Sequence, residues 1–91
     1  MVTLKDALKE MLDYYKLKSK LHQSSIRKTW QTLMGPTISQ YTREIKLTGK
    51  KLYIHIESAS LRQELSYGKD KIRTLMNESL GEDYIEEVII R

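Results

Sequence analysis

The chain has 91 residues, with 16 Lys and Arg against 12 Asp and Glu, so its formal net charge is +4, and it has no cysteine. This length allows one small domain, and the lack of cysteine excludes disulfides, a thiolate nucleophile and cysteine-ligated zinc. The longest apolar run is the three residues 88–90, and the N-terminus lacks the apolar stretch of a signal peptide. We therefore expect a soluble protein of the cytoplasm.

The charge is spread unevenly along the chain. Residues 1–75 hold 15 basic and seven acidic residues, a net of +8, whereas residues 76–91 hold one basic and five acidic residues, a net of −4. Such an asymmetric field attracts polyanions to one side of a small domain. The same side chains also serve simply to solvate exposed faces, so the charge alone leaves both interpretations open.

The first segment, residues 3–20, is predicted to be an amphipathic helix. Thr3 and Asp6 have the spacing of a capping box. The apolar stripe of this helix is expected to be buried and consists of Leu4, Leu8, Met11, Leu12 and Tyr15. Four lysines lie off the stripe and are expected in solvent: Lys5, Lys9, Lys16 and Lys20. The polar run 22–25 is expected to interrupt the helix, with one of its serines capping the next.

A second helix is predicted to bury one apolar side, made of Ile26, Trp30, Leu33 and Met34. Trp30 is interpreted as a core residue because it shares its helical phase with Ile26 and Leu33. The helix is expected to end at Gly35-Pro36, because glycine tolerates a left-handed cap and proline cannot continue the hydrogen-bond ladder.

The apolar period then changes from helical to two. Residues 41–48 and 52–57 alternate between apolar and polar side chains on either side of a Gly-Lys-Lys turn at 49–51. This pattern predicts an antiparallel hairpin. One face of the hairpin is apolar throughout, so we expect it to pack on helices.

A third helix is predicted over residues 58–80, with a serine at its start as the cap. Gly68 lies inside its apolar stripe and marks either a kink or a close approach of another helix. Gly81 is expected to end the helix, and residues 84–91 to add a third strand. The order ααββαβ predicts an α+β fold in which a three-stranded sheet packs on helices, as one domain over residues 1–91.

Catalytic or metal chemistry has little support in the sequence. His22 and His55 are far apart and have no cysteine or third histidine to complete a metal site. There is no Gly-x-Ser-x-Gly elbow, and the four glycines form no phosphate-binding cluster. Glu86 and Glu87 are adjacent on a predicted strand and would point to opposite faces. We expect no enzymatic activity, no cofactor and no metal.

Nucleic-acid binding fits the basic residues better. On the third helix, Arg62, Lys69 and Arg73 return to nearly the same angle and form a cationic row suited to phosphates. Tyr53 shares the outer hairpin face with Lys46 and His55, where a single-strand base can stack. The candidate binding residues are Lys46, Lys50, Lys51, Tyr53, Arg62, Lys69, Arg73, Arg27 and Lys28. The alternatives are a solvated helix face for the row and a plain cross-strand pair for Tyr53.

Short segments spread over residues 20–91 match a known family in their order and spacing. They are the segment from Trp30 to Gly35, then Ile38, Tyr41-Thr42, the hairpin from Gly49 to Ile56, Ser58, Glu64-Leu65, Leu75 to Asn77, Leu80-Gly81 and Ile90-Arg91. In these the chain resembles the DciA-like family, catalogued as domain of unknown function 721.

The resemblance implies a KH-like α+β domain that binds DNA and works with the bacterial replicative helicase at initiation, without hydrolysing ATP itself. Leu61 stands where the family commonly has a second tryptophan. Longer members carry a flexible extension that contacts the helicase, so this chain is expected to be a short form. No two glycines here are three positions apart, which excludes RNA recognition through the Gly-x-x-Gly loop of KH domains.

The favoured interpretation is a non-enzymatic DNA-binding accessory of the replicative helicase. This accessory would bind the phosphates of single- or double-stranded DNA independently of the base sequence. One alternative is a protein-interaction adaptor with no direct DNA contact, whose basic face meets an acidic partner surface or whose acidic residues at 82–87 dock on a basic partner. If the final strand lies at the sheet edge, it could also pair with a second copy to form a dimer. An RNA- or ribosome-associated protein is the third alternative.

Overall fold

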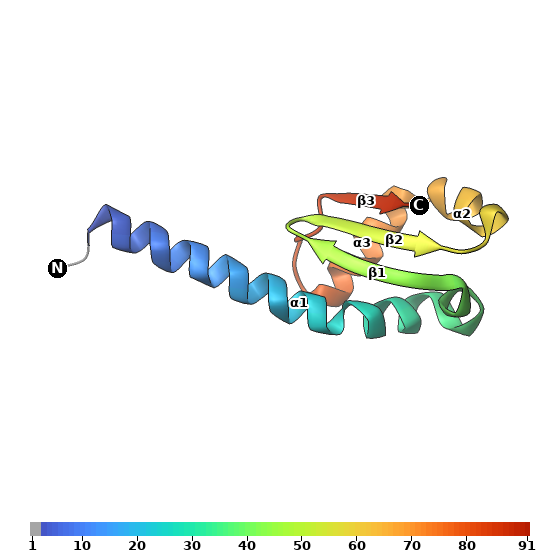
Figure 1. The fold of residues 1–91 in the computed structure, drawn as a ribbon, viewed down its shortest axis with the longest axis horizontal. Coiled ribbons are helices and arrows are strands. Elements are labelled where there is room, and N and C mark those ends of the chain that lie inside the picture. The colour runs from blue at the N-terminus through green and yellow to red at the C-terminus, as the bar shows by residue number, and fades with distance from the viewer. Residues whose placement is uncertain (1–2) are drawn as a thin grey trace.

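The computed structural model describes residues 3–91, except for the side chains of Tyr15 and Ser19. Its elements, in chain order, are α1 (Leu4–Tyr41), β1 (Thr42–Thr48), β2 (Lys51–Ile56), α2 (Ala59–Ser66), α3 (Lys69–Leu80) and β3 (Glu87–Ile90). Figure 1 shows a body made of the sheet and its helices, from which the N-terminal half of α1 extends alone.

The sheet has the order β1-β2-β3, with β2 in the centre. β2 pairs antiparallel with β1 across the hairpin and parallel with β3. Parallel neighbours need a long crossover, which α2 and α3 provide. The second half of α1 contacts β1 and α3, and these two helices cover one face of the sheet while the other stays open (Figure 1). The α+β class and the three-stranded sheet are confirmed.

The core lies between the covered sheet face and the two helices. The strands contribute Ile45, Leu47, Leu52, Ile54, Ile56 and Val88. Trp30 is 1% exposed, and its Nε1–H donates to the Thr42 hydroxyl oxygen at 2.9 Å. That hydroxyl donates in turn to the Ile38 carbonyl, also at 2.9 Å. Trp30 is therefore a core residue, as predicted, and its one polar atom is satisfied.

Helix α1 is longer than predicted, because the expected break at 22–25 does not occur. The hydroxyls of Ser24 and Ser25 donate back to the carbonyls of Leu21 and His22 and cap no new helix. The polar side chains of this run instead begin the contact with the body. The Gln23 carboxamide oxygen accepts the Leu47 N–H at 2.6 Å.

The prediction that the first apolar stripe is buried is wrong. Leu4, Leu8, Met11 and Leu12 are 78%, 48%, 47% and 57% exposed; the side chain of Tyr15, the fifth member, lies outside the described part. The molecule measures 57 × 20 × 20 Å because this half of α1 runs past the end of the sheet. The four lysines expected in solvent are exposed.

The predicted stop at Gly35-Pro36 is present as a kink. Gly35 has φ 80° and ψ 177°, outside the helical region, and the chain resumes a short helical stretch up to Tyr41. The Ser39 hydroxyl donates to the Gly35 carbonyl at 2.7 Å. The kink turns the chain so that β1 can start on the sheet.

The predicted third helix is split at the candidate kink. α2 ends at Ser66, and Gly68 is the N-cap of α3, whose left-handed C-cap is Gly81 with φ 80°. Ser58 caps α2 by accepting the Leu61 N–H at 3.3 Å. The last strand is shorter than predicted.

Residues 84 and 85 are buried but lie in the loop before β3. The Asn77 carboxamide holds this loop: its oxygen accepts the Ile85 N–H at 2.7 Å, and its nitrogen donates to the Ile85 carbonyl at 3.0 Å. Hydrogen bonds from α3 thus replace the strand pairing that the sequence predicted for this segment.

Candidate nucleic-acid interface

Tyr53 is the centre of the open sheet face. Its register partners are Lys46 on β1 and Ile89 on β3. The Arg91 guanidinium lies over the Tyr53 ring, with Cζ 4.8 Å from the ring centroid. An exposed aromatic ring can stack a base, and neighbouring cations can bind the adjacent phosphates. The predicted placement of Tyr53, Lys46 and His55 on one outer face is confirmed; Arg91 was not foreseen there.

The lysines of the hairpin tip face carboxylates of the C-terminal segment. Lys50 Nζ lies 3.5 Å from Glu86 Oε1, and Lys51 Nζ lies 3.8 Å from Glu87 Oε2. All four side chains are more than half exposed. Exposed pairs of this kind contribute about 0.2–1 kcal/mol, so a phosphate can displace the carboxylates at small cost.

The predicted cationic row on one helix is wrong. Arg62 lies on α2, whereas Lys69 and Arg73 lie on α3, because the turn at Tyr67-Gly68 breaks the helical phase. The Arg62 guanidinium donates to the Ile56 carbonyl at 2.9 Å and lies half-buried against the end of β2. Arg73 Nη1 is 4.0 Å from Asp83 Oδ1. Lys69 is exposed.

The two basic residues of α1 differ in what they contact. The Arg27 guanidinium donates to the Arg43 carbonyl at 3.3 Å, which directs it to the start of β1. Lys28 is exposed and borders a depression with Thr29, Thr32 and Ser79 between α1 and α3. Among the described residues, none forms an ion pair with Lys28, Lys46 or Lys69.

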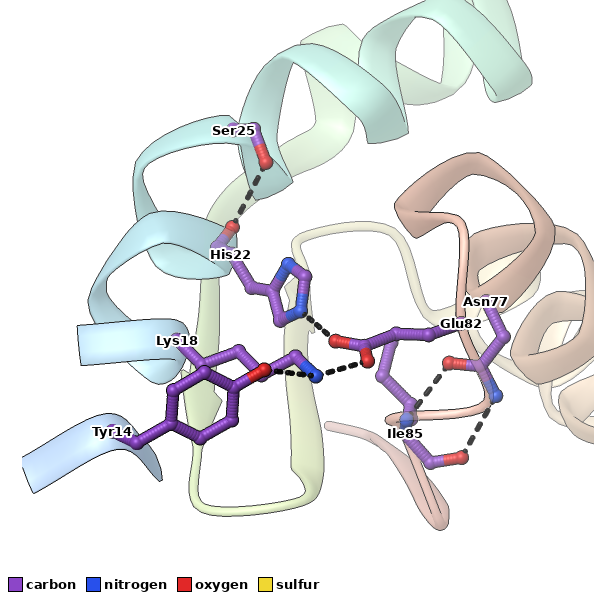
Figure 2. A network of polar contacts seen from close by, with 7 residues as sticks. All are labelled: Tyr14, Lys18, His22, Ser25, Asn77, Glu82 and Ile85. Carbon is purple, nitrogen blue, oxygen red and sulfur yellow. Dashed lines mark hydrogen bonds and ion pairs between the residues drawn. The ribbon is translucent and has the colours of Figure 1, made fainter. Parts of the chain in front are cut away.

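Glu82 joins α1 to the loop after α3 in the cluster of Figure 2. It forms an ion pair with Lys18, and its Oε1 is 2.5 Å from His22 Nε2. The Lys18 ammonium, and then the His22 ring, lower the pKa of Glu82 below its ordinary value, while Glu82 raises the pKa of Lys18. The His22 ring also meets Tyr84 edge-on at 4.7 Å. His22 is thus engaged in docking α1.

The four acidic residues at 82–87 are all engaged within the chain. Glu82, Glu86 and Glu87 pair with basic side chains as described above. Asp83 Oδ1 accepts from Asn77 Nδ2 at 3.0 Å and lies near Arg73. The sequence suggested these carboxylates as a docking surface for a basic partner, and the fold brings a cation of the chain itself to each of them.

The described residues 3–91 carry neither a metal site nor a membrane-spanning helix. No group of three or more metal-ligating side chains of the described residues lies together. No helix of this part is long and apolar enough to cross a membrane. His22 lies on α1 and His55 on β2, on different elements of the fold.

The fold and the surface define a small α+β domain whose distinctive features are an open sheet face and dispersed surface cations. The family described as Dna[CI] antecedent, DciA, matches residues 3–90. The chain belongs to this family, which is linked to the loading of the replicative helicase in bacterial DNA replication and is not a catalytic family. No curated protein and no solved structure is significantly similar to the chain, so the KH-like topology implied by the resemblance stays a prediction.

The segments that carried the resemblance have structural roles. Trp30 fills the core, and Gly35 and Gly81 adopt positive φ values. Asn77 fixes the loop that leads to β3. The residues that carry the resemblance therefore maintain the fold. The candidate DNA contacts are different residues, which lie on the surface.

Proposed function

We propose that the chain is a non-enzymatic accessory of the replicative helicase that binds DNA directly, in the bacterial cytoplasm, at the initiation of replication. Family membership supports the link to the helicase. The observation that supports direct DNA contact is the open sheet face, where Lys46 is the register partner of Tyr53 and the Arg91 guanidinium lies over the Tyr53 ring.

On this face the DNA is a single strand. A base must be unpaired to stack on Tyr53, where it takes the place of the Arg91 guanidinium over the ring. Such stacking contributes about 1–3 kcal/mol per base. Lys46 and Arg91 neutralise the adjacent phosphates, which releases counterions. Because these contacts read no base edge, binding is independent of sequence.

The remaining candidate residues would bind further phosphates of the DNA backbone. They differ in whether they must first give up a contact within the protein. Lys28 and Lys69 are available at once, because neither is paired within the described part. Lys50 and Lys51 first exchange a glutamate for a phosphate. Arg27, Arg62 and Arg73 already contact protein groups and contribute at the margin of the site.

The test is fluorescence anisotropy with labelled single- and double-stranded DNA and an RNA control, at about 50 and 200 mM salt. Tyr53→Ala is expected to weaken single-strand binding about tenfold. Tyr67→Ala instead removes a 79% exposed tyrosine from the turn after α2 and is the matched control. Affinity that is unchanged by Tyr53→Ala, or that is independent of salt, would refute this site.

The hairpin tip is tested separately, by a variant that is expected to strengthen DNA binding rather than weaken it. Glu86→Gln with Glu87→Gln releases Lys50 and Lys51 and is expected to strengthen DNA binding several-fold at low salt. Glu64→Gln with Glu78→Gln makes the same charge change on exposed helix positions. Equal gains in both double variants would mean that net charge alone acts, and no gain would exclude the tip from the site.

The adaptor interpretation is less well supported than DNA binding. The carboxylates at 82–87 that it invokes are paired with cations of the chain itself. A basic partner would have to displace the exposed pairs of Glu86 and Glu87 and also the Glu82–Lys18 pair, whose side chains are only 29% and 27% exposed. A pull-down separates the two functions: helicase recovered from nuclease-treated lysate indicates direct docking, whereas recovery lost with nuclease indicates DNA as the bridge.

A further inference from the structure

The N-terminal half of α1, which extends away from the sheet and the other helices (Figure 1), has an exposed apolar face. Seven of the nine large apolar side chains that are exposed in the described residues lie in this half: Leu4, Leu8, Met11, Leu12, Tyr14, Leu17 and Leu21. A contiguous apolar patch of this kind on a small protein indicates a surface that is covered by a partner.

The spacing on this face is that of a helix that pairs with another helix. Leu4, Leu8 and Met11, followed by position 15, are separated by steps of 4, 3 and 4, the apolar repeat of a coiled coil. Leu12 widens the face on one side and Tyr14 on the other. The lysines at 5, 9, 16 and 20 lie away from the centre of the face.

We propose that two copies of the chain pair through this face, with their helices antiparallel. The face is in phase with the docked side of α1, since Leu8 and Ile26 are 18 positions, about five turns, apart. A parallel copy would therefore run into the sheet and α3, which cover that side beyond His22. An antiparallel copy avoids this collision and also opposes the two helix dipoles.

One antiparallel register makes the pairing self-complementary. It sets Leu4 against position 15 and Leu8 against Met11 of the second copy, which gives four apolar layers within residues 4–15. These layers end before Lys18, where the body begins. Beside them, Lys5 meets Leu12 and Ala7 meets Tyr14, so like charges do not face each other at the contact positions.

The area available is adequate for a reversible dimer. At roughly 100–150 Å² each, the five exposed side chains between Leu4 and Tyr14 offer about 600 Å² per copy, toward the lower end of specific interfaces. We expect a dissociation constant on the order of 10 µM. Because the face is distinct from β3, pairing leaves the sheet edge and Tyr53 uncovered.

The test is sedimentation equilibrium of the full chain from about 1 to 500 µM. The wild type is expected to change from monomer to dimer, and Leu8→Glu, which puts a charge into two central layers, to raise the dissociation constant more than about 100-fold. Lys9→Gln changes the net charge equally beside the face and should dimerise like the wild type. The fluorescence of Trp30 checks the fold of each variant.

A monomeric wild type at 500 µM would overturn the proposal. Dimerisation that persists in Leu8→Glu would assign the contact elsewhere, for instance to the β3 edge. The orientation is tested by disulfide formation, since the chain has no cysteine of its own. Leu4→Cys mixed with Tyr15→Cys is expected to cross-link, whereas cross-linking of Leu4→Cys with itself would refute the antiparallel arrangement.

Discussion

Replacing Asn77 by alanine tests whether one buried carboxamide holds α3 to the loop before β3. The change removes both bonds to Ile85 and leaves its N–H and C=O without a partner in the interior. Each buried orphan group costs about 1–3 kcal/mol, so the expected loss of unfolding free energy is about 3 kcal/mol. In a domain of this size that lowers the melting temperature by on the order of 15 °C.

Urea unfolding, followed through the fluorescence of Trp30, measures this loss. Glu78→Ala, at the exposed neighbouring position, should stay within about 0.5 kcal/mol of the wild type. Asn77→Asp keeps an acceptor for the Ile85 N–H but loses the donor and adds a charge beside Asp83, so it should also destabilise. A loss below about 1 kcal/mol in Asn77→Ala would refute the reasoning.

Two further outcomes follow from residues of the loop after α3. Gly81→Ala should cost about 1 kcal/mol in urea unfolding through its positive φ alone, because an added Cβ meets no atom within 4 Å. A neutral result would contradict the left-handed cap. The pKa of Glu82 is lowered in the folded chain, so the stability it provides is complete above about pH 4.5 and is lost as the pH falls through the lowered value. The melting temperatures of the wild type and Glu82→Gln should therefore differ near neutral pH and converge in acid; a constant difference would exclude titration of this carboxylate.

The hairpin, the core position of Trp30 and the glycine cap at Gly81 were predictable because their signals are local. Alternation of apolar residues defines strand faces, and a glycine after a helix favours the left-handed cap. The same alternation placed Tyr53 and Lys46 together on the open face, which is the centre of the candidate interface.

The length of α1 was not predictable, because the meaning of the polar run 22–25 is tertiary. His22 and Gln23 are polar since they meet Glu82 and a strand N–H, and those partners are distant in the sequence. The apolar spacing in the first part of α1 likewise indicates a face that packs against another element. It does not indicate whether that element belongs to the same chain. The ion pairs of Lys50 and Lys51 depend on the parallel register of β2 and β3, which has no local sequence signature.

Helix α1 is one helix with two different sources of stability. An isolated helix of 18 residues is marginal in water because nucleation carries a penalty of about 10⁻³. The contacts of residues 22–34 with the body stabilise the first helical turns there. Residues 4–21 therefore need no nucleation of their own and only extend a helix that already exists. The capping box of Thr3 and Asp6 closes its far end. Unwinding therefore proceeds from the N-terminus toward the body, and the reach of the 57 Å molecule is governed by a helix–coil equilibrium that shortens it on warming.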